Sequence, residues 1–165
     1  MNLTLKILGF TLLTSASASL FAADAAPAAD KQAGPNAGKQ AIAVRKAAYT
    51  LIGNSFKPIG DAAQGKVEYN QADIQKRANR ILVLSEFLDS AFPEASNLGE
   101  PDTKAKADVW AKKAEFDKKL KDFQEHAATL VKVTATEKTA SDAFKEAFGN
   151  LAKDCKGCHE SFKFK

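Results

Sequence analysis

The sequence is short of the side chains that most often bind metals. Its 165 residues include one methionine, Met1, together with two cysteines and two histidines. Because the only thioether lies at the first residue, no methionine ligand is available to a metal centre elsewhere in the chain. The two cysteines and two histidines could supply the four donors of one structural zinc site, but not of a second.

Three further features are missing. No segment alternates apolar and polar residues with a period of two, so no β-strand is expected. The N-terminal apolar run, residues 7–13, is shorter than a membrane span and is soon followed by serines. Basic side chains exceed acidic ones only by 24 to 20 and are scattered, which argues against nucleic-acid binding. The sequence predicts one helical domain, with no membrane attachment once its N-terminal segment is removed.

The N-terminal segment is typical of a secretory signal peptide, residues 1–22. Lys6 precedes the apolar run, and alternating serines and alanines lead towards Ala22, after which cleavage is expected. The alternative is that this segment is not cleaved and holds the protein at the membrane. Residues 23–38 are rich in alanine, proline, glycine and asparagine, which predicts a flexible N-terminal leader. Residues 39–165 then form the folded domain, and export to a bacterial periplasm is expected.

The motif Cys-Lys-Gly-Cys-His occupies residues 155–159, close to the end of the sequence. C-x-x-C-H is typical of c-type haem attachment, with both thiols bonded to the haem and the histidine bound to iron. We therefore predict one haem c, held covalently by Cys155 and Cys158, with His159 as axial ligand. A redox-active cysteine pair usually accompanies a βαβ pattern, which is missing here. A zinc site would have to recruit His126.

Apolar residues recur at helical spacing in four segments. The first begins near Gln40, and the second begins with Asn70 as N-cap and ends before Pro93. A polar connection, residues 95–108, precedes the third. Two capping-box sequences, at residues 134–137 and 139–142, are candidates for the start of the fourth. The apolar stripe of the fourth segment contains Phe144, Phe148, Leu151, Cys155, Cys158 and Phe162.

Both cysteines thus lie on the face of the last helix that points into the core. A haem attached there can be covered by all four helices. The predicted fold class is all-α, an antiparallel four-helix bundle with a covalently attached haem and one longer connection between the second and third helices.

This arrangement resembles the cytochrome c′ family, the class II c-type cytochromes, over residues 39–165. Besides the haem-attachment motif at residues 155–159, called the anchor from here on, the resemblance depends on two other segments. They are Arg-Lys-Ala-Ala-Tyr at residues 45–49 and Thr-Lys-Ala-Lys-Ala-Asp-Val-Trp at residues 103–110. It implies that Arg45 pairs with a haem propionate and that Lys46 lines the haem edge. It also implies that Thr103 and Lys104 lie near the propionates.

The resemblance further implies that Tyr49 covers the open face of the iron and that Trp110 packs near the haem. A tryptophan at this position could equally well serve only to pack the hydrophobic core. Members of the family commonly form homodimers through their first two helices, so we expect a homodimer here.

Four positions depart from the family's usual residues. Lys46 replaces a glutamine, Lys104 replaces a glutamate, and Phe162 and Lys163 replace a tyrosine and an arginine. The family's arginine lies beside the proximal histidine. Lys163 keeps the positive charge but loses the planar donor fork, so the resemblance does not predict the proximal face.

Because the sequence has no methionine beyond Met1 that could act as a second ligand, we predict a five-coordinate, high-spin iron. A single protein ligand leaves the opposite position of the iron open. His126 lies off the apolar stripe of its helix, which predicts a surface or interface position. A Tyr49 phenolate ligand would need a strongly lowered pKa. We expect Tyr49, Ile52 and Phe56 to form an apolar, crowded distal pocket that favours NO and, more weakly, CO over O₂.

Such a haem can also carry single electrons to and from redox partner proteins. The alternative function is a dedicated periplasmic electron-transfer cytochrome with a six-coordinate, low-spin haem. No histidine–arginine pair is available to polarise peroxide, so no enzymatic activity is expected.

Overall fold

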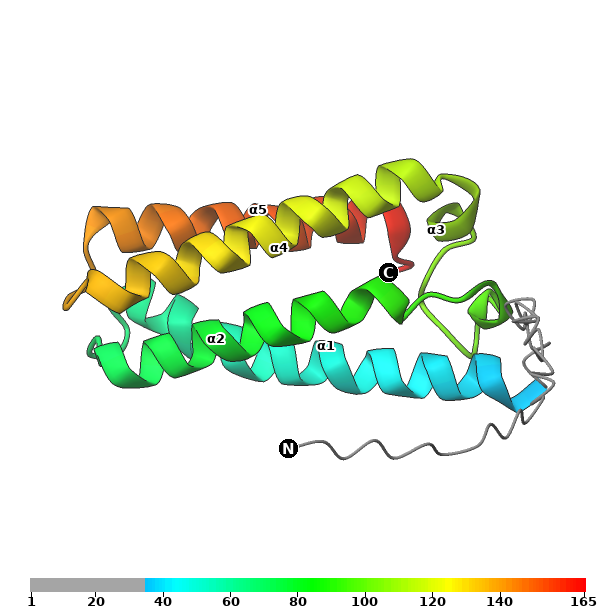
Figure 1. The fold of residues 1–165 in the computed structure, drawn as a ribbon, viewed down its shortest axis with the longest axis horizontal. Coiled ribbons are helices and arrows are strands. Elements are labelled where there is room, and N and C mark those ends of the chain that lie inside the picture. The colour runs from blue at the N-terminus through cyan, green and yellow to red at the C-terminus, as the bar shows by residue number, and fades with distance from the viewer. Residues whose placement is uncertain (1–34) are drawn as a thin grey trace, which may run out of the picture. The chain divides into compact units, whose positions relative to one another are not determined.

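The computed structural model describes residues 35–165, which form four long helices (Figure 1). These are α1 (Pro35–Ala63), α2 (Gln71–Phe87), α4 (Lys113–Thr136) and α5 (Asp142–Phe162). They run alternately in opposite directions; α2 packs against α1 and α4, and α4 against α5. The predicted antiparallel four-helix bundle is confirmed. The expected signal peptide, residues 1–22, and residues 23–34 of the expected leader lie outside the described residues.

The connection between α2 and α4 is long, as predicted, and has structure of its own. It contains the short helices η1 (Leu88–Ser90), η2 (Glu94–Ser96) and α3 (Asp108–Ala111). Near the end of α5 it forms two backbone hydrogen bonds, from the N–H of Lys106 to the carbonyl of Phe162 at 2.9 Å and from the N–H of Phe164 to the carbonyl of Lys104 at 2.8 Å. Within residues 35–165, this isolated bridge is the only extended pairing.

Side-chain caps mark the starts of α2 and α5. Asn70 caps α2 as predicted, and its Oδ1 accepts a hydrogen bond from the N–H of Asp73 at 3.0 Å. The cap of α5 is Ser141, whose Oγ accepts from the N–H of Phe144 at 3.2 Å. Both predicted capping boxes are therefore wrong. Residues 134–136 still belong to α4, where Thr134 is completely buried, and the cap of α5 is the third residue of the second box, Ser141, instead of its first residue, Thr139.

The first helix begins earlier than the sequence predicts. Residues 35–38 were expected in the leader, but α1 starts at Pro35, and proline is well suited to the first helical turn. Gly38 is buried against the connection, where a Cβ added to it would lie 2.0 Å from the carbonyl oxygen of Ala95. This packing requires a glycine and compensates for its low helix propensity.

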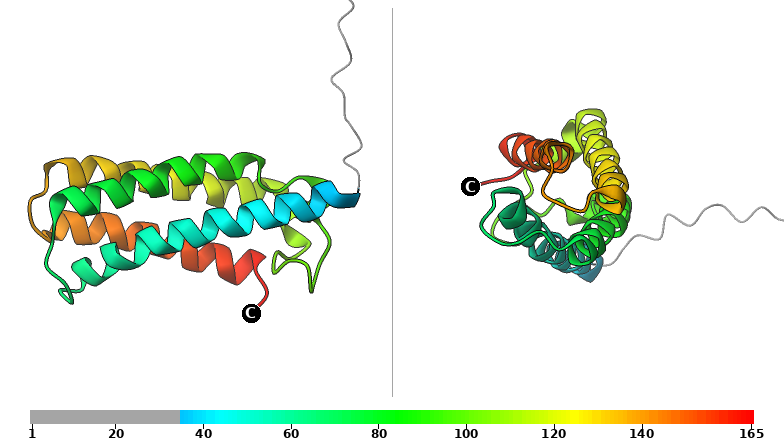
Figure 2. Two further views of the ribbon diagram at one scale, coloured as in Figure 1. Left: turned by 90° about the horizontal axis from the view of Figure 1, so that it is seen from below. Right: turned by 90° about the vertical axis from the view of Figure 1, so that its left-hand side faces the viewer.

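The core has two parts, which lie at different levels of the bundle. The main cluster consists of side chains from the four helices, whose backbones Figure 2 shows end-on. A smaller cluster joins the end of α5 to α3 and the start of α4. Its buried residues are Val109, Phe116 and Phe162, with Phe92, Trp110 and Cys158 packed against them. The anchor motif lies where the two clusters meet, since Cys155 packs on the main cluster.

Candidate haem site

Helix α5 places the two anchor cysteines one turn apart on its inner face. Both are free and half-buried, between the two core clusters. Burial raises the pKa of Cys155 to about 11, and the neighbouring Asp154 carboxylate adds to this effect. Burial also raises the pKa of Cys158. A redox-active cysteine pair needs a thiol with a lowered pKa, so this environment does not suit one.

His159 follows the second cysteine and lies on the exposed side of the same helix. Partial burial lowers the pKa of its imidazole, and the positive charge of Lys163 lowers it further. The neutral imidazole is therefore favoured, which is the form that can bind a metal. Two thiols one turn apart and one neutral imidazole next to the second thiol match the groups that attach and ligate a c-type haem.

A zinc site is not formed by these residues. Among residues 35–165, no group of three or more histidine, cysteine, aspartate or glutamate side chains could hold a metal ion. The other histidine, His126 on α4, contacts Asp154 on α5 instead, with 2.6 Å between its Nδ1 and the carboxylate Oδ2. His126 is about 39% exposed, in agreement with the surface or interface position predicted for it.

Arg45 is a buried cation on α1 with no carboxylate partner in the described part of the chain. Only 3% of it is exposed. Its guanidinium donates hydrogen bonds to Ser96 Oγ at 2.7 Å and to Thr103 Oγ1 at 2.6 Å, and it lies 4.8 Å from the ring centre of Phe92. Burial lowers its pKa, yet an arginine side chain keeps its charge. A buried charge needs an opposite charge, and a haem propionate would supply it.

The other predicted propionate residues lie on the same connection or face it. Lys46 donates to the backbone carbonyl of Asp102 at 2.8 Å. Lys104 is exposed and forms an ion pair with Glu100 at 2.6 Å. Thr103 is buried, and its hydroxyl oxygen binds Arg45. The structure therefore brings Arg45 and Thr103 into direct contact, while both lysines bind protein groups at the surface.

Trp110 is fixed in the smaller cluster. Its indole Nε1 donates to the carbonyl of Phe92 at 3.1 Å, and the Arg45 guanidinium lies 5.8 Å from its ring centre. Trp110 is thus both part of a core cluster and next to Arg45. The two roles considered from the sequence are compatible.

The predicted distal residues lie at three successive levels along α1. Tyr49 lies near the anchor and is 37% exposed. Burial of its hydroxyl and the nearby thiols of Cys158 and Cys155 raise its pKa well above the ordinary value. Ile52 is buried in the main cluster one turn further on. Phe56 packs on Phe148 of α5 with 4.6 Å between ring centres, so it lies about two turns beyond Tyr49.

Three residues near the site could not be found from the sequence. Ser96 and Phe92 surround Arg45, although they lie about 50 positions away in a segment with no recognisable motif. Lys119 on α4 lies close to the anchor, since its Nζ would be 3.6 Å from a Cβ added to Gly157. Its charge partly offsets the rise in the pKa of Cys158.

Four other lysines in or next to α4 differ from Lys119, because they are paired with acidic side chains. They form ion pairs with acidic residues four positions away, which makes this face a solvated surface. The pairs are Lys112 with Asp108, Lys113 with Asp117, Lys118 with Asp122, and Lys121 with Glu125.

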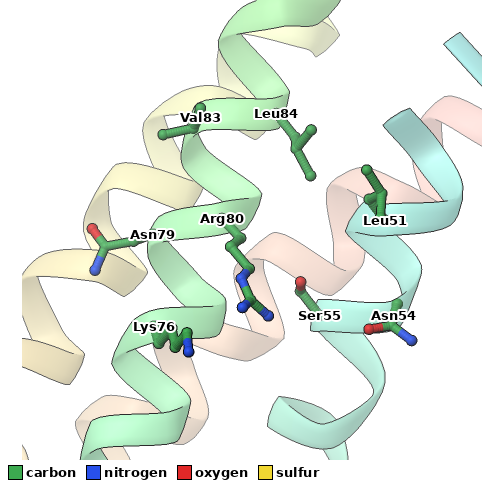
Figure 3. Close-up of a pocket in the computed structure, with 8 residues that line it drawn as sticks. All are labelled: Leu51, Asn54, Ser55, Lys76, Asn79, Arg80, Val83 and Leu84. Atoms are coloured by element: carbon green, nitrogen blue, oxygen red, sulfur yellow. The ribbon is translucent and has the colours of Figure 1, made fainter. Parts of the chain in front are cut away.

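A cleft of about 630 Å³ lies elsewhere, on the outer side of α1 and α2 (Figure 3). Figure 3 shows Arg80 of α2 extending towards Ser55 of α1, with Leu51, Val83 and Leu84 at the upper end. Leu51 and Val83 are 55% and 65% exposed. These residues are distant in sequence from the anchor, and the cleft has no cysteine or histidine in its lining.

Together, the bundle and the anchor define a class of protein: a four-helix c-type cytochrome whose haem is attached near the end of its last helix. A sequence model of the family described as "Cytochrome C'" matches residues 40–163. The chain therefore belongs to the cytochrome c′ family, and it carries a single, covalently attached c-type haem. None of its described helices has the length and apolar character needed to cross a membrane.

Individual relatives agree with this assignment. Cytochrome c' of Rubrivivax gelatinosus is 35% identical over 126 residues, covering 76% of this chain and 95% of the relative. That of Halomonas halodenitrificans is 30% identical over 128 residues, covering 76% and 96%. The solved structure of cytochrome c prime from Shewanella frigidimarina superimposes with a TM-score of 0.72 at 34% identity, covering 78% of this chain and 97% of that chain.

Proposed function

We propose that this protein is a periplasmic haem protein with a five-coordinate, high-spin iron that binds NO and CO at an open distal position. His159 is the single axial ligand from the protein, and Cys155 and Cys158 hold the haem. The bound haem supplies a ferrous iron that can accept a diatomic ligand and exchange one electron. The protein side chains orient the haem, control access and exclude competing ligands.

The observation that carries this proposal is the set of side chains opposite the anchor. The sequence has no methionine beyond Met1, and His126 is engaged with Asp154. Tyr49 lies near the anchor, but its raised pKa keeps the phenol protonated and therefore a poor iron ligand. No strong second ligand is within reach from α1.

Known relatives support the choice of ligand. One solved structure with a TM-score of 0.70 and 26% identity is an arginine-to-lysine variant of cytochrome c prime from Alcaligenes xylosoxidans, in the ferrous form with bound NO. Another variant of the same protein, 25% identical, has carbon monoxide bound. Apart from the Tyr49 hydroxyl, a distal side formed by Tyr49 and Ile52 offers no hydrogen-bond donor to O₂, whereas NO and CO depend less on such a donor.

The visible spectrum of the reduced protein, with and without NO, tests the proposal. We expect a broad high-spin spectrum that changes on addition of NO. Sharp α and β bands without any added ligand would mean six-coordinate iron and would support the dedicated electron carrier instead. The variant Tyr49→Met is the matched control, because a thioether at this position should produce those sharp bands.

We infer that the protein is also a homodimer, assembled through α1 and α2. The apolar side chains exposed on these helices support this arrangement, because a contact with a second copy would remove them from water. They are Val44, Leu51, Val83 and Phe87.

Export is a further part of the proposal. Cleavage after Ala22 would release the folded domain into the periplasm. N-terminal sequencing of the protein purified from a periplasmic extract tests this directly. A chain that retains Lys6 and remains with the membrane fraction would overturn it.

A further inference from the structure

Arg45 is held by the connection between α2 and α4 through an ordered chain of hydrogen bonds. An arginine only donates, so the Ser96 oxygen must accept from it at 2.7 Å. The Ser96 hydroxyl in turn donates to the carbonyl of Pro93 at 2.7 Å. Thr103 Oγ1 accepts from Arg45 and also from the N–H of Ala105 at 3.1 Å. Both hydroxyls are thus oriented by the backbone of the connection.

The connection itself is fixed to α1 close to this point. Gly38 lies seven residues before Arg45, which is about two helical turns and places both residues on one face. The Ala95 carbonyl approaches Gly38 so closely that an added Cβ would be 2.0 Å away. The contact at Gly38 and the hydrogen bond to Ser96 therefore hold η2 against α1 at two levels. Ser96 is completely buried, so water cannot replace its hydroxyl.

Only two of the five N–H donors of Arg45 are used by these hydroxyls. Neither partner carries a charge, and the described residues provide no carboxylate for the guanidinium. The remaining donors are available to an anion, and their direction depends on how the guanidinium is held.

We propose that Ser96 is a positioning residue for the haem, which holds the Arg45 guanidinium so that its free donors meet a propionate. This inference rests on the proposed haem site, since it requires a propionate near Arg45. A cation held beside a propionate stabilises the reduced form of the haem, because reduction adds one negative charge to the haem. Loosening the guanidinium should lower the reduction potential, although Ser96 carries no charge and acts only through Arg45.

The test compares reduction potentials of the holoprotein at neutral pH. Ser96→Ala should lower the potential, and Arg45→Gln should lower it more, because the latter removes the charge completely. In the Arg45→Gln background, adding Ser96→Ala should cause no further fall. A Ser96→Ala effect that persists there would overturn the positioning role, as would an unchanged potential in the single variant.

Ser85→Ala is the matched control. Ser85 is also completely buried, and its hydroxyl donates to the carbonyl three residues earlier, that of Leu82, at the same 2.7 Å. It has no contact with an arginine. Ser85→Ala should therefore destabilise the fold to a similar extent and leave the potential unchanged. If Arg45→Gln itself does not change the potential, the proposed propionate contact fails; if it does and Ser96→Ala does not, only the present inference fails.

Discussion

At the scale of single residues, burial is the main cause of the pKa shifts of the two cysteines, His159 and Tyr49. The pKa of Tyr49 is raised because its hydroxyl loses water and lies near the two thiols, while Arg45 opposes that shift. The pKa of Tyr69, the other tyrosine of the chain, is raised by burial and by Glu137. Both phenols are therefore neutral over the working pH range, and the site contains no anionic oxygen from tyrosine.

This predicts how stability depends on pH in the alkaline range. In the unfolded chain a tyrosine ionises near pH 10, but in the folded protein Tyr49 retains its proton at that pH. The folded state then binds more protons than the unfolded state, so the free energy of unfolding should fall as the pH rises above about 10. Denaturant unfolding at a series of pH values measures this slope. Tyr49→Phe should make it shallower, and an unchanged slope would contradict the assignment.

At the scale of helices, α1 shows how one element meets two different environments. Gly60 faces α5, where a Cβ added to it would lie 2.9 Å from Cζ of Phe148. Gly53 is on the same helix, and nothing lies within 4 Å of its added Cβ. The same substitution should therefore have opposite effects at the two positions.

Gly60→Ala should lower the free energy of unfolding by about 1–3 kcal/mol, because the ring of Phe148 has to move in a packed core. Gly53→Ala should raise it by about 0.5–1 kcal/mol, because alanine loses less conformational entropy than glycine in a helix. Chemical denaturation of the two variants beside the parent protein measures both values. Equal effects at both positions would argue that Phe148 does not pack on Gly60.

The elements also show what could be predicted from the sequence. The helical spacing of Leu151, Cys155 and Cys158 predicted their inward face correctly, because that face depends only on local geometry. The role of Ser96 could not be predicted, because its partner Arg45 is 51 positions away and meets it only through tertiary packing. The start of α1 at Pro35 was missed for the same reason, since Gly38 is stabilised by the distant Ala95.

At the scale of the whole molecule, the exposed apolar surface of α1 and α2 predicts self-association. Val83→Glu places a charge where Val83 is now 65% exposed, and in a dimer that charge would be buried without a partner. We expect the variant to sediment as a monomer at concentrations where the parent is a dimer. Val67→Glu is the control, because Val67 is 51% exposed but lies in the turn after α1, outside the cleft. A parent protein that is itself monomeric would contradict the proposal.

The short bridge between the connection and the end of α5 has a mechanical consequence. Its hydrogen bonds join Lys104 and Lys106 to Phe164 and Phe162, shortly after His159, the proposed iron ligand. The same stretch of connection carries Thr103, which holds Arg45. His159, the proposed iron ligand, and Arg45, the proposed partner of a haem propionate, are thus linked through this bridge and the side-chain hydrogen bond between Arg45 and Thr103. We therefore expect a displacement of the C-terminal turn to be transmitted to the Arg45 guanidinium through these bonds.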